Sequence, residues 1–304
     1  MGRLSPRLGA VLQALFVTFL WSTSVVLIKV GLESVPPLAF AGLRYSLAFL
    51  CLAPLVLLRP AGRASLRRLT GKRWAELLAL GVVMYALTQG AQFLALARLP
   101  AATVSLVLSI TPALVAFLGV VLLSEVPTRL QWIGVGLYLC GALAYLYPFG
   151  FPAGELVGLV VVAVGLAGNA GAGVLGRAVN RRADLDPLTV TAVSMGVGSA
   201  VLLAAGLGTR GLPALGPTAW LIVAWLAVAN TAFAFWLWNR TLRTLTAVES
   251  GVVNNTMLVQ VSMLAWAFLG EGLSARGVFG LVVAALGTLL VQLRRPPRGA
   301  EPPG

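Results

Sequence analysis

Long apolar stretches dominate the chain, and short polar segments that carry most of the charges separate them. A helix needs about 20 apolar residues to cross a bilayer. Ten stretches qualify, namely 9–31, 37–58, 74–96, 101–123, 130–147, 155–177, 187–208, 217–239, 247–270 and 275–293. Because the stretches are long and do not alternate between apolar and polar positions, they predict helices rather than strands. The pattern therefore predicts an all-α integral membrane protein with ten transmembrane helices.

The composition agrees with this interpretation. Of the 304 residues, 59% are hydrophobic and 10% are charged, whereas about a quarter of the residues of a soluble domain are charged. Histidine is absent, and we interpret Cys51 and Cys140, which lie within apolar stretches, as small buried hydrophobic side chains. The first apolar stretch is too long for the core of a signal peptide, so we expect it to remain in the protein. No motif indicates a cofactor, a metal site or catalytic residues, and we predict that the protein is not an enzyme.

Basic residues are distributed unevenly between the two sides that ten helices define. Seventeen share a side with both termini, two lie within predicted helices, and three (Arg98, Arg210 and Arg276) lie on the other side. The net charge of +13 therefore reflects membrane topology rather than nucleic-acid binding. The positive-inside rule predicts a multi-pass protein of the cell inner membrane with cytoplasmic N- and C-termini. The basic, proline-rich segment 294–304 predicts a disordered cytoplasmic tail.

The chain matches itself at an offset of 146 residues, as shown by Trp74 with Trp220 and by Glu125 with Glu271. Further identical pairs are Ala86 and Ala232, Leu96 and Leu242, Ala101 and Ala247, Gly134 and Gly280, and Gly141 and Gly287. We predict two repeats of five helices, 1–147 and 148–293. Because five is odd, the second repeat is inverted relative to the first. Inverted repeats are typical of secondary transporters whose substrate site lies between the two halves.

Four segments resemble a known family. They are LWSTSVVLIK at 20–29, PPLAFAGLRYSLAFL at 36–50, AATVSLVLSITPALVAFLGVVLLSE at 101–125 and WAFLGEGLS at 266–274. In these segments, and over nearly its whole length, the chain resembles a drug/metabolite transporter of the EamA type. The resemblance implies ten helices in two EamA repeats, and export or exchange of small metabolites, amino acids among them, across the bacterial inner membrane. The family's mid-helix proline is present as Pro112 in the first repeat, but the second repeat has Leu258.

Polar side chains gather on one face of several predicted helices, for example Thr18 and Ser22 with Trp21 and Lys29 on the first helix. These faces are expected to point into the bundle, because polar groups avoid lipid. Any single amide either forms interhelical hydrogen bonds, worth about 1 kcal/mol each, or lines a cavity, while the faces together favour a central aqueous cavity. Trp21, Tyr85 and Trp238 would form an aromatic part of its wall, with core packing or an aromatic belt at the membrane interface as the alternative. The candidate substrate-binding residues are Trp21, Lys29, Arg44, Tyr85, Gln89, Gln92, Asn169, Asn230, Trp238, Asn254 and Asn255.

Two of these candidates are charged. Lys29 lies near the outer end of the first helix, where it can extend to the headgroups and pair with Glu33. Arg44 lies about 12 Å into the second helix, where charges usually face protein or water, and no acid lies at that depth. Both residues are either structural anchors or groups that attract a carboxylate.

Two further patterns concern packing and mechanism. Gly134 and Gly141, like Gly280 and Gly287, lie seven residues apart, which predicts that the fifth and tenth helices pack closely. The sequence contains no histidine, and Glu249 is the least unsuitable of its carboxylates for carrying protons. The side chains that could form a proton relay are therefore lacking. Facilitated movement, exchange or coupling through the substrate's own charge fits better.

The sequence therefore predicts a secondary transporter, an exporter or exchanger, that moves small metabolites such as amino acids by alternating access through a cavity between the repeats. A channel, or a membrane scaffold or receptor that transports nothing, is the alternative. The expected partners are the substrate and membrane lipid, without nucleic acid. The oligomeric state stays open, and a monomer is compatible with the sequence.

Overall fold

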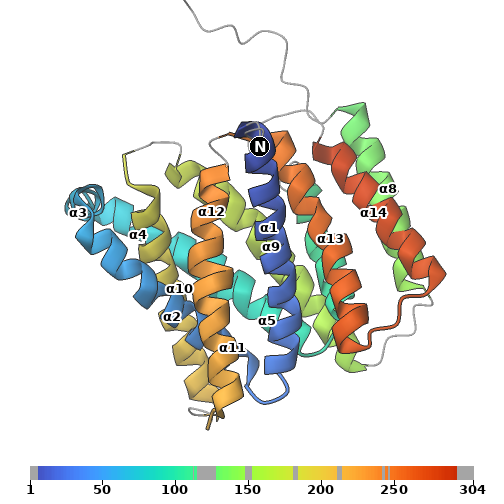
Figure 1. Ribbon diagram of the computed structural model, residues 1–304, viewed down its shortest axis with the longest axis horizontal. Coiled ribbons are helices and arrows are strands. Elements are labelled where there is room, and N and C mark those ends of the chain that lie inside the picture. Colours follow the sequence, from blue (N-terminus) through green and yellow to red (C-terminus); the bar gives the residue numbers. More distant parts are fainter. Residues whose placement is uncertain are drawn as a thin grey trace, which may run out of the picture.

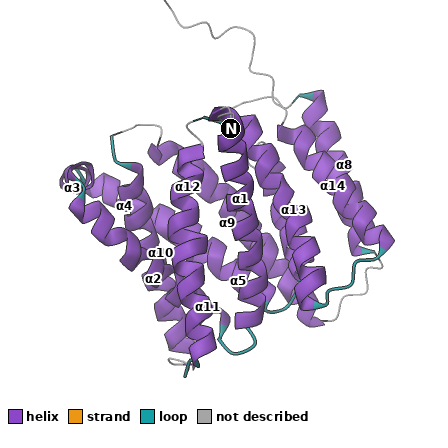
Figure 2. Cartoon of the chain, in the orientation of Figure 1, coloured by secondary structure: helices purple, strands orange, loops and turns teal. Residues whose placement is uncertain are grey.

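The computed structural model describes residues 6–111, 113–114, 128–147, 153–180, 184–210, 214–241, 244–245 and 247–292. Within these ranges every regular element is a helix, as Figure 2 shows. Most of the long helices lie side by side (Figure 1). The helix α1 begins and the helix α14 ends on the same side of the bundle, the upper side in Figure 1, which is called the terminal side below. The opposite side, called the far side, carries the connections 32–36, 97–100 and 270–274.

The helices of the first half run from the N-terminus to residue 146. They are α1 (Pro6–Gly31), α2 (Pro37–Leu58), α3 (Pro60–Arg67), the continuous run α4 (Gly71–Gly81), η1 (Val82–Gln89) and α5 (Gly90–Leu96), and then α6 (Ala101–Ser109) and α8 (Arg129–Leu146). The helices of the second half are α9 (Ala153–Asn180), α10 (Pro187–Arg210), the continuous run α11 (Pro217–Ala227), η2 (Val228–Phe233) and α12 (Ala234–Thr241), and then α13 (Ala247–Leu269) and α14 (Ala275–Gln292).

The apolar stretches predicted these helices closely. Among the described residues, nine continuous helical runs begin and end within three residues of a predicted stretch. In the part of the chain that the structure describes, five helices are both long and apolar enough to cross a membrane, and shorter apolar helices lie at 217–233, 253–269 and 275–290. The stretch 101–123 is described only at its start, by α6. The sequence did not predict α3, because a helix of eight residues with two arginines carries no transmembrane signal.

Some expectations fall outside the described residues. They concern Pro112, Glu125, the side chain of Glu249, and the tail 294–304.

Two segments of π-helix interrupt the third long helical run of each half. The segment η1 begins at Val82, and η2 begins at Val228, which is 146 residues later. In η1 the Thr88 hydroxyl donates to the carbonyl oxygen of Val83 at 2.8 Å. In η2 the Thr231 hydroxyl donates to the carbonyl oxygen of Leu226, also at 2.8 Å. Short π-helical segments within α-helices frequently occur at functional sites.

The helices α8 and α14 pack against each other along their length. A Cβ atom at Gly141 would lie 2.4 Å from the backbone nitrogen of Ala284, and one at Gly287 would lie 2.4 Å from that of Tyr138. Only glycine permits so close an approach of the two backbones. The prediction that the fifth and tenth helices pack through their glycines is therefore confirmed.

The contacts between the halves come in matched pairs. The helix α1 packs on α13, and its counterpart α9 packs on α6. In the same way α1 contacts α12 while α9 contacts η1 and α5, and α2 contacts α11 while α10 contacts α4. The helices α2 and α10 are counterparts in the two halves and contact each other, and the same is true of α8 and α14. Exchanging the two halves therefore leaves this set of neighbours unchanged.

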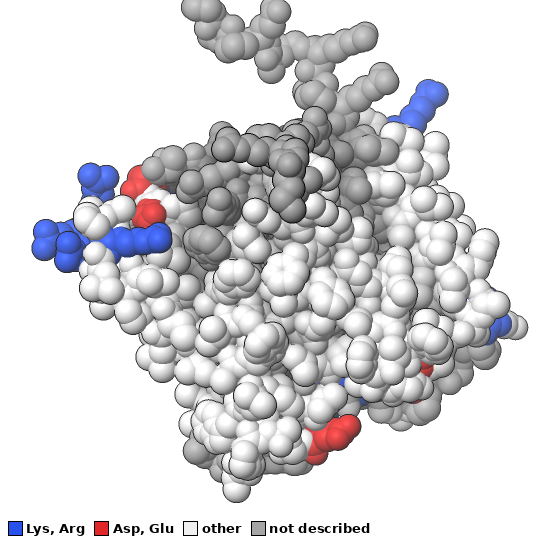
Figure 3. Space-filling view, viewed as in Figure 1, with Lys and Arg blue, Asp and Glu red and all other residues white. Residues whose placement is uncertain are grey.

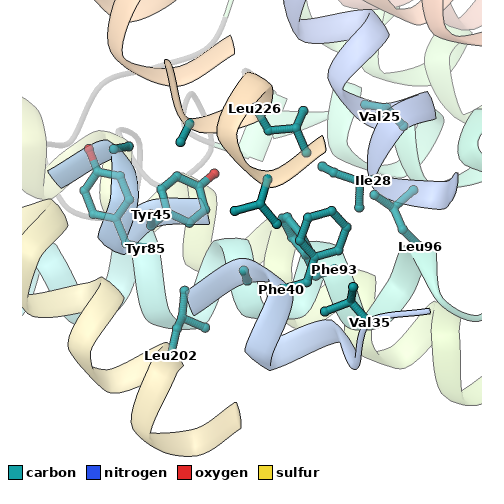
Figure 4. Close-up of a cluster of buried hydrophobic side chains, with 14 of the residues drawn as sticks. Val25, Ile28, Val35, Phe40, Tyr45, Tyr85, Phe93, Leu96, Leu202 and Leu226 are labelled. Atoms are coloured by element: carbon teal, nitrogen blue, oxygen red, sulfur yellow. The ribbon is translucent and has the colours of Figure 1, made fainter. Parts of the chain in front are cut away.

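The largest buried cluster among the described residues joins α1, α2, η1, α5, α6, α9, α10, α11 and α13, and Figure 4 shows part of it. The rings of Phe40 and Phe93 meet edge to face at 5.3 Å, and those of Tyr45 and Tyr85 at 5.5 Å. The outer surface is apolar as well, with Leu58 74% exposed and Phe268 72% exposed, and Figure 3 shows a wide uncharged face. A surface of this kind suits contact with lipid chains.

Candidate functional site

A cavity of about 390 Å³ lies within the bundle. Its walls come from α4, η1, α9, α10 and α12, together with Thr111 just after α6. The lining residues are Leu80, Met84, Tyr85, Thr111, Asn169, Ala172, Gly173, Gly176, Val190, Thr191, Ser194, Phe235 and Trp238. Both halves of the chain therefore contribute to one cavity. Its volume lies within the range of about 300–1,000 Å³ that is common for small-molecule sites.

The cavity extends toward the terminal side of the bundle. Gly176 lies one turn before the end of α9, Val190 lies in the first turn of α10, and Trp238 lies in the last turn of α12. The chain direction places all three of these helix ends on the terminal side (Figure 1).

The structure brings three sequence-predicted residues together in this lining: Tyr85, Asn169 and Trp238. The side-chain nitrogen of Asn169 donates to the hydroxyl of Thr111 at 3.1 Å, which links α9 to the end of α6 across the bundle. The amide oxygen and the second N–H group of Asn169 stay free of this bond. Asn169 therefore combines both roles that the sequence left open, because it forms a hydrogen bond between helices and lines the cavity.

Trp21 packs directly behind the aromatic part of the wall. Its ring centroid lies 5.2 Å from that of Trp238 and 5.4 Å from that of Phe235. Trp238 and Phe235 in turn line the cavity. Trp21 thus supports the aromatic surface from α1.

Among the described residues of the lining there is no Asp, Glu, Lys or Arg. Its polar groups are the Tyr85 hydroxyl, the Asn169 amide and the hydroxyls of Thr111, Thr191 and Ser194. The Ser194 hydroxyl donates to the carbonyl oxygen of Val190 at 2.6 Å, which leaves its oxygen as an acceptor. A cavity with aromatic and neutral polar walls suits a ligand that presents a planar ring or a delocalised cation together with hydrogen-bonding groups.

Lys29 belongs to a different cluster, on the far side of the bundle. Its ammonium group donates to the carbonyl oxygen of Leu99 at 2.8 Å and lies 3.6 Å from Oε1 of Glu271. The same carboxylate accepts hydrogen bonds from the backbone N–H groups of Ala101 at 2.7 Å and Ala102 at 3.3 Å. Glu271 therefore caps the N-terminus of α6, where free N–H groups and the helix dipole favour a negative charge.

The expected pairing of Lys29 with Glu33 is wrong. Glu33 is exposed, while Glu271, from the connection after α13, is the described partner of Lys29. The physical reason is that α13 packs against both α1 and α6, which brings the Glu271 carboxylate to the free N–H groups of α6.

Arg44 is buried, with 5% of its surface exposed. Its Nε atom donates to the hydroxyl of Thr231 in η2 at 3.1 Å, and its guanidinium lies 5.2 Å from the centre of the Tyr45 ring. In the described part of the chain no acidic side chain pairs with it. Arg44 is not among the cavity-lining residues, so its contact with a substrate carboxylate stays a prediction.

The remaining amide candidates lie outside the cavity. Gln89 accepts a hydrogen bond from the Tyr45 hydroxyl at 2.6 Å. Asn230 is fully buried and donates to the carbonyl oxygen of Leu20 and the hydroxyl of Thr23, whereas its own side-chain oxygen has no partner. Both residues thus join helices. Gln92 is half-buried, Asn254 is exposed, and Asn255 is half-buried with an unpartnered side-chain nitrogen.

A polar network between α1 and α13 was only half predicted. Ser22 donates to Oε1 of Gln260 at 2.9 Å, and the Gln260 amide donates to the hydroxyls of Thr256 at 3.0 Å and Thr18 at 3.3 Å. Thr18 and Ser22 belong to the polar face recognised in the sequence, whereas Gln260 was missed. Its position one turn after Thr256 was the available signal.

The cavity residues Thr111, Thr191 and Ser194 were missed as well. Hydroxyl side chains in membrane helices often bond to their own backbone, so the sequence alone does not show which of them face a cavity. Within the described ranges, no group of three metal-ligating side chains comes together.

Comparisons with known proteins add to this geometry. The EamA-like transporter family matches residues 8–147 and again residues 156–293. A protein of Chlamydia trachomatis serovar L2 named S-adenosylmethionine/S-adenosylhomocysteine transporter is 26% identical over 285 residues, covering 90% of this chain and 86% of that protein. A protein of the same name from Chlamydia muridarum is also 26% identical, with 90% and 88% covered. A protein of known crystal structure is similar in fold, with a TM-score of 0.66 at 20% identity over 94% of this chain and 97% of that one.

Proposed function

Because the chain belongs to the EamA-like transporter family, we propose that this membrane transporter is a secondary transporter that works by alternating access. In this proposal it moves an amino-acid-derived metabolite through the cavity between its two halves, across the cytoplasmic membrane. The observation that carries the proposal is the cavity itself, which is built from both halves and whose described lining reaches helix ends on the terminal side.

The proposal includes ten helices in two inverted repeats of five. The sequence offset of 146 residues supports it, as does the same offset between the two π-helical segments. The matched contacts of the two halves are also what a two-fold axis in the membrane plane produces. Two states that differ by exchanging the roles of the halves would then open the cavity to each side in turn.

In this proposal the cluster of Lys29 and Glu271 holds the far side closed. The ion pair of Lys29 with Glu271 joins the two halves, and the carboxylate also holds the start of α6. In the proposed topology the terminal side is cytoplasmic, because it carries most of the basic residues. The present structure then corresponds to an inward-facing state.

The proposed substrate class follows from the lining and from the relatives. S-adenosylmethionine, after which the relatives are named, combines a planar adenine ring, a sulfonium cation and an amino-acid group. An aromatic wall attracts a cation without needing a carboxylate, and neutral amide and hydroxyl groups suit the polar edges of the ring. We therefore place S-adenosylmethionine and S-adenosylhomocysteine first among the amino-acid derivatives to be tested.

Counterflow in proteoliposomes tests the function. Vesicles preloaded with unlabelled S-adenosylhomocysteine should accumulate labelled S-adenosylmethionine transiently above its equilibrium level, and Asn169→Ala should abolish most of this overshoot. The exposed residue Asn254 provides the matched control, since Asn254→Ala should transport normally. A panel of free amino acids tests the wider class. Flux without overshoot would favour a channel, and the absence of flux with every compound would favour a scaffold or receptor.

A further inference from the structure

Five exposed basic residues surround α3 at the terminal side of the bundle. They are Arg59, Arg63, Arg67, Arg68 and Lys72, and they are called the basic patch below. Within the described part of the chain none of the five forms an ion pair. Figure 3 shows basic side chains projecting from the end of the molecule where α3 lies, beyond a broad uncharged surface.

The patch is not neutralised by neighbouring residues in the sequence. No acidic residue lies between Glu33 and Glu76. Arg63 and Arg67 are four residues apart on the same helix, a spacing at which like charges repel and destabilise the helix. In the described part of the chain, the nearby acids Glu76 and Asp184 pair with Arg73 rather than with the patch. The patch is therefore suited to an anionic partner that lies outside the protein chain.

The position of α3 is fixed by contacts on its other face. A Cβ atom at Gly62 would lie 2.2 Å from the carbonyl oxygen of Val56, so only glycine lets α3 pass so close to the end of α2. The Ser65 hydroxyl accepts a hydrogen bond from the backbone N–H of Asp186 at 2.8 Å, which ties α3 to the segment before α10. Because Gly62 and Ser65 are buried, Arg63 and Arg67 are turned outward.

The surroundings place the patch at the level of lipid headgroups. Leu57 and Leu58, at the end of α2, are 56% and 74% exposed, and Trp74, near the start of α4, is 42% exposed. Exposed aliphatic side chains suit the hydrocarbon region, and tryptophan is enriched at the membrane interface. In Figure 1 α3 is seen nearly end-on whereas α2 beside it is seen from the side, so α3 runs across the bundle at its end.

We propose that the basic patch is a binding site for anionic phospholipid headgroups in the leaflet on the terminal side. The guanidinium groups of Arg63 and Arg67 donate to the phosphate oxygens, and the lipid chains lie against the exposed leucines at the end of α2. Arginine suits this role because its planar fork matches the geometry of a phosphate group. Clusters of four to eight basic residues beside a transmembrane helix have the composition that anionic lipids attract.

Native mass spectrometry of the full chain in detergent tests the site. Phosphatidylglycerol should bind with higher affinity than phosphatidylcholine. In the double variant Arg63→Gln/Arg67→Gln the affinity for phosphatidylglycerol should fall about 30-fold, which corresponds to about 1 kcal/mol for each basic residue near an anionic surface. Arg63→Lys/Arg67→Lys should retain most of the affinity, because the charge remains. Arg129→Gln is the matched control, since Arg129 is an exposed arginine away from α3 at the start of α8.

Three outcomes would overturn the proposal. The first is equal affinity for the two lipids, and the second is a loss of phosphatidylglycerol affinity in Arg129→Gln equal to that in the double glutamine variant. The third is displacement of phosphatidylglycerol by inorganic phosphate at equal concentration, which would make the patch a site for free anions. If the glutamine variant is not monodisperse, the wild-type protein still decides the question. Its preference for phosphatidylglycerol should decline steeply as salt is raised, and a preference that salt does not change contradicts the site.

Discussion

Nζ of Lys29 on α1 lies 3.6 Å from Oε1 of Glu271 after α13, and this ion pair joins the two halves of the protein on the far side. The Glu271 carboxylate also accepts two backbone hydrogen bonds at the start of α6. A single carboxylate thus links its own segment after α13 to two others, α1 and the start of α6, at the far side. In the proposed alternating-access cycle an opening of that side would separate these segments, so the ion pair should contribute to the balance between the two proposed states.

Glu271→Gln should shift the protein toward the state that is open on the far side. Glutamine retains an acceptor for Ala101 but loses the charge that attracts Lys29 and complements the helix dipole, an effect of about 1 kcal/mol. This corresponds to a shift of about fivefold in the population. The measurement is labelling of Asn169→Cys, in a background that lacks Cys51 and Cys140, by a membrane-impermeant thiol reagent applied from the far side.

The control for this measurement is Glu33→Gln, because Glu33 is an exposed acid on the same side that lies outside the cluster. It should label like the parent protein. If Glu271→Gln and Glu33→Gln label alike, the ion pair does not contribute to closure of the far side.

The difference between what the sequence predicted and what it missed has a physical basis here. Helix positions follow from apolar length, which is local, and the nine helical runs therefore agree with the predicted stretches. The partner of Lys29 depends on how α13 packs against α6, and no local pattern encodes that packing. Glu33 was the nearest acid in sequence, and the three-dimensional arrangement selected Glu271 instead.

The candidate site shows the same division. The sequence pattern indicated Tyr85, Asn169 and Trp238, which combine a polar group with an aromatic ring or are amides. All three line the cavity. The amides Gln89 and Asn230 have the same sequence signal but bond to neighbouring helices. Composition cannot separate these cases, because a π-helical segment rotates the residues that follow it relative to a regular α-helix, and no sequence pattern predicted η1 or η2.

Cysteine labelling should separate cavity residues from buried amides. In the background without Cys51 and Cys140, Asn169→Cys and Thr191→Cys should react with a water-soluble thiol reagent added from the terminal side. Asn230→Cys should stay unreactive, because Asn230 is fully buried between helices. The substrate should slow labelling of the two cavity positions. Equal reactivity at all three positions, or none at any, would contradict the assignment of the cavity.

The glycine contacts between α8 and α14 should be essential for stability. In Gly287→Val the new side chain meets the backbone of Tyr138, which a Cβ atom would approach to 2.4 Å. Separating two closely packed helices should cost at least about 2 kcal/mol, in the range of overpacked cores, and should lower the melting temperature in detergent.

Gly136→Ala is the control on the same pair of helices, because a Cβ atom there meets nothing within 4 Å. It should melt at the parent temperature or slightly above, since alanine favours helix. Equal melting of both variants would show that the close contact does not support the fold.

Arg44 provides the last prediction, because two interpretations of it lead to different transport phenotypes. The guanidinium has five N–H groups, and among the described residues its one hydrogen-bond partner is Thr231, through Nε. No described acid neutralises it, and an unpaired charge inside a membrane costs at least about 2.5 kcal/mol. We expect Arg44 to attract the carboxylate of the substrate during the cycle, while Thr231 orients it.

Arg44→Gln should therefore lower the transport of carboxylate substrates at least tenfold, since a hydrogen bond to a charged group contributes about 1.5–3 kcal/mol. An analogue of the same substrate without the carboxylate should be affected much less. Arg44→Lys should be intermediate, because lysine keeps the charge but loses the planar fork.

Thr231→Val is the matched control, as it removes the described partner of Arg44 and should lower transport of both compounds by a similar factor. The measurement is initial flux per correctly folded molecule, with folding judged by monodispersity in detergent. If Arg44→Gln reduces both compounds equally, as Thr231→Val does, then Arg44 is a structural anchor of η2 and recognises no carboxylate.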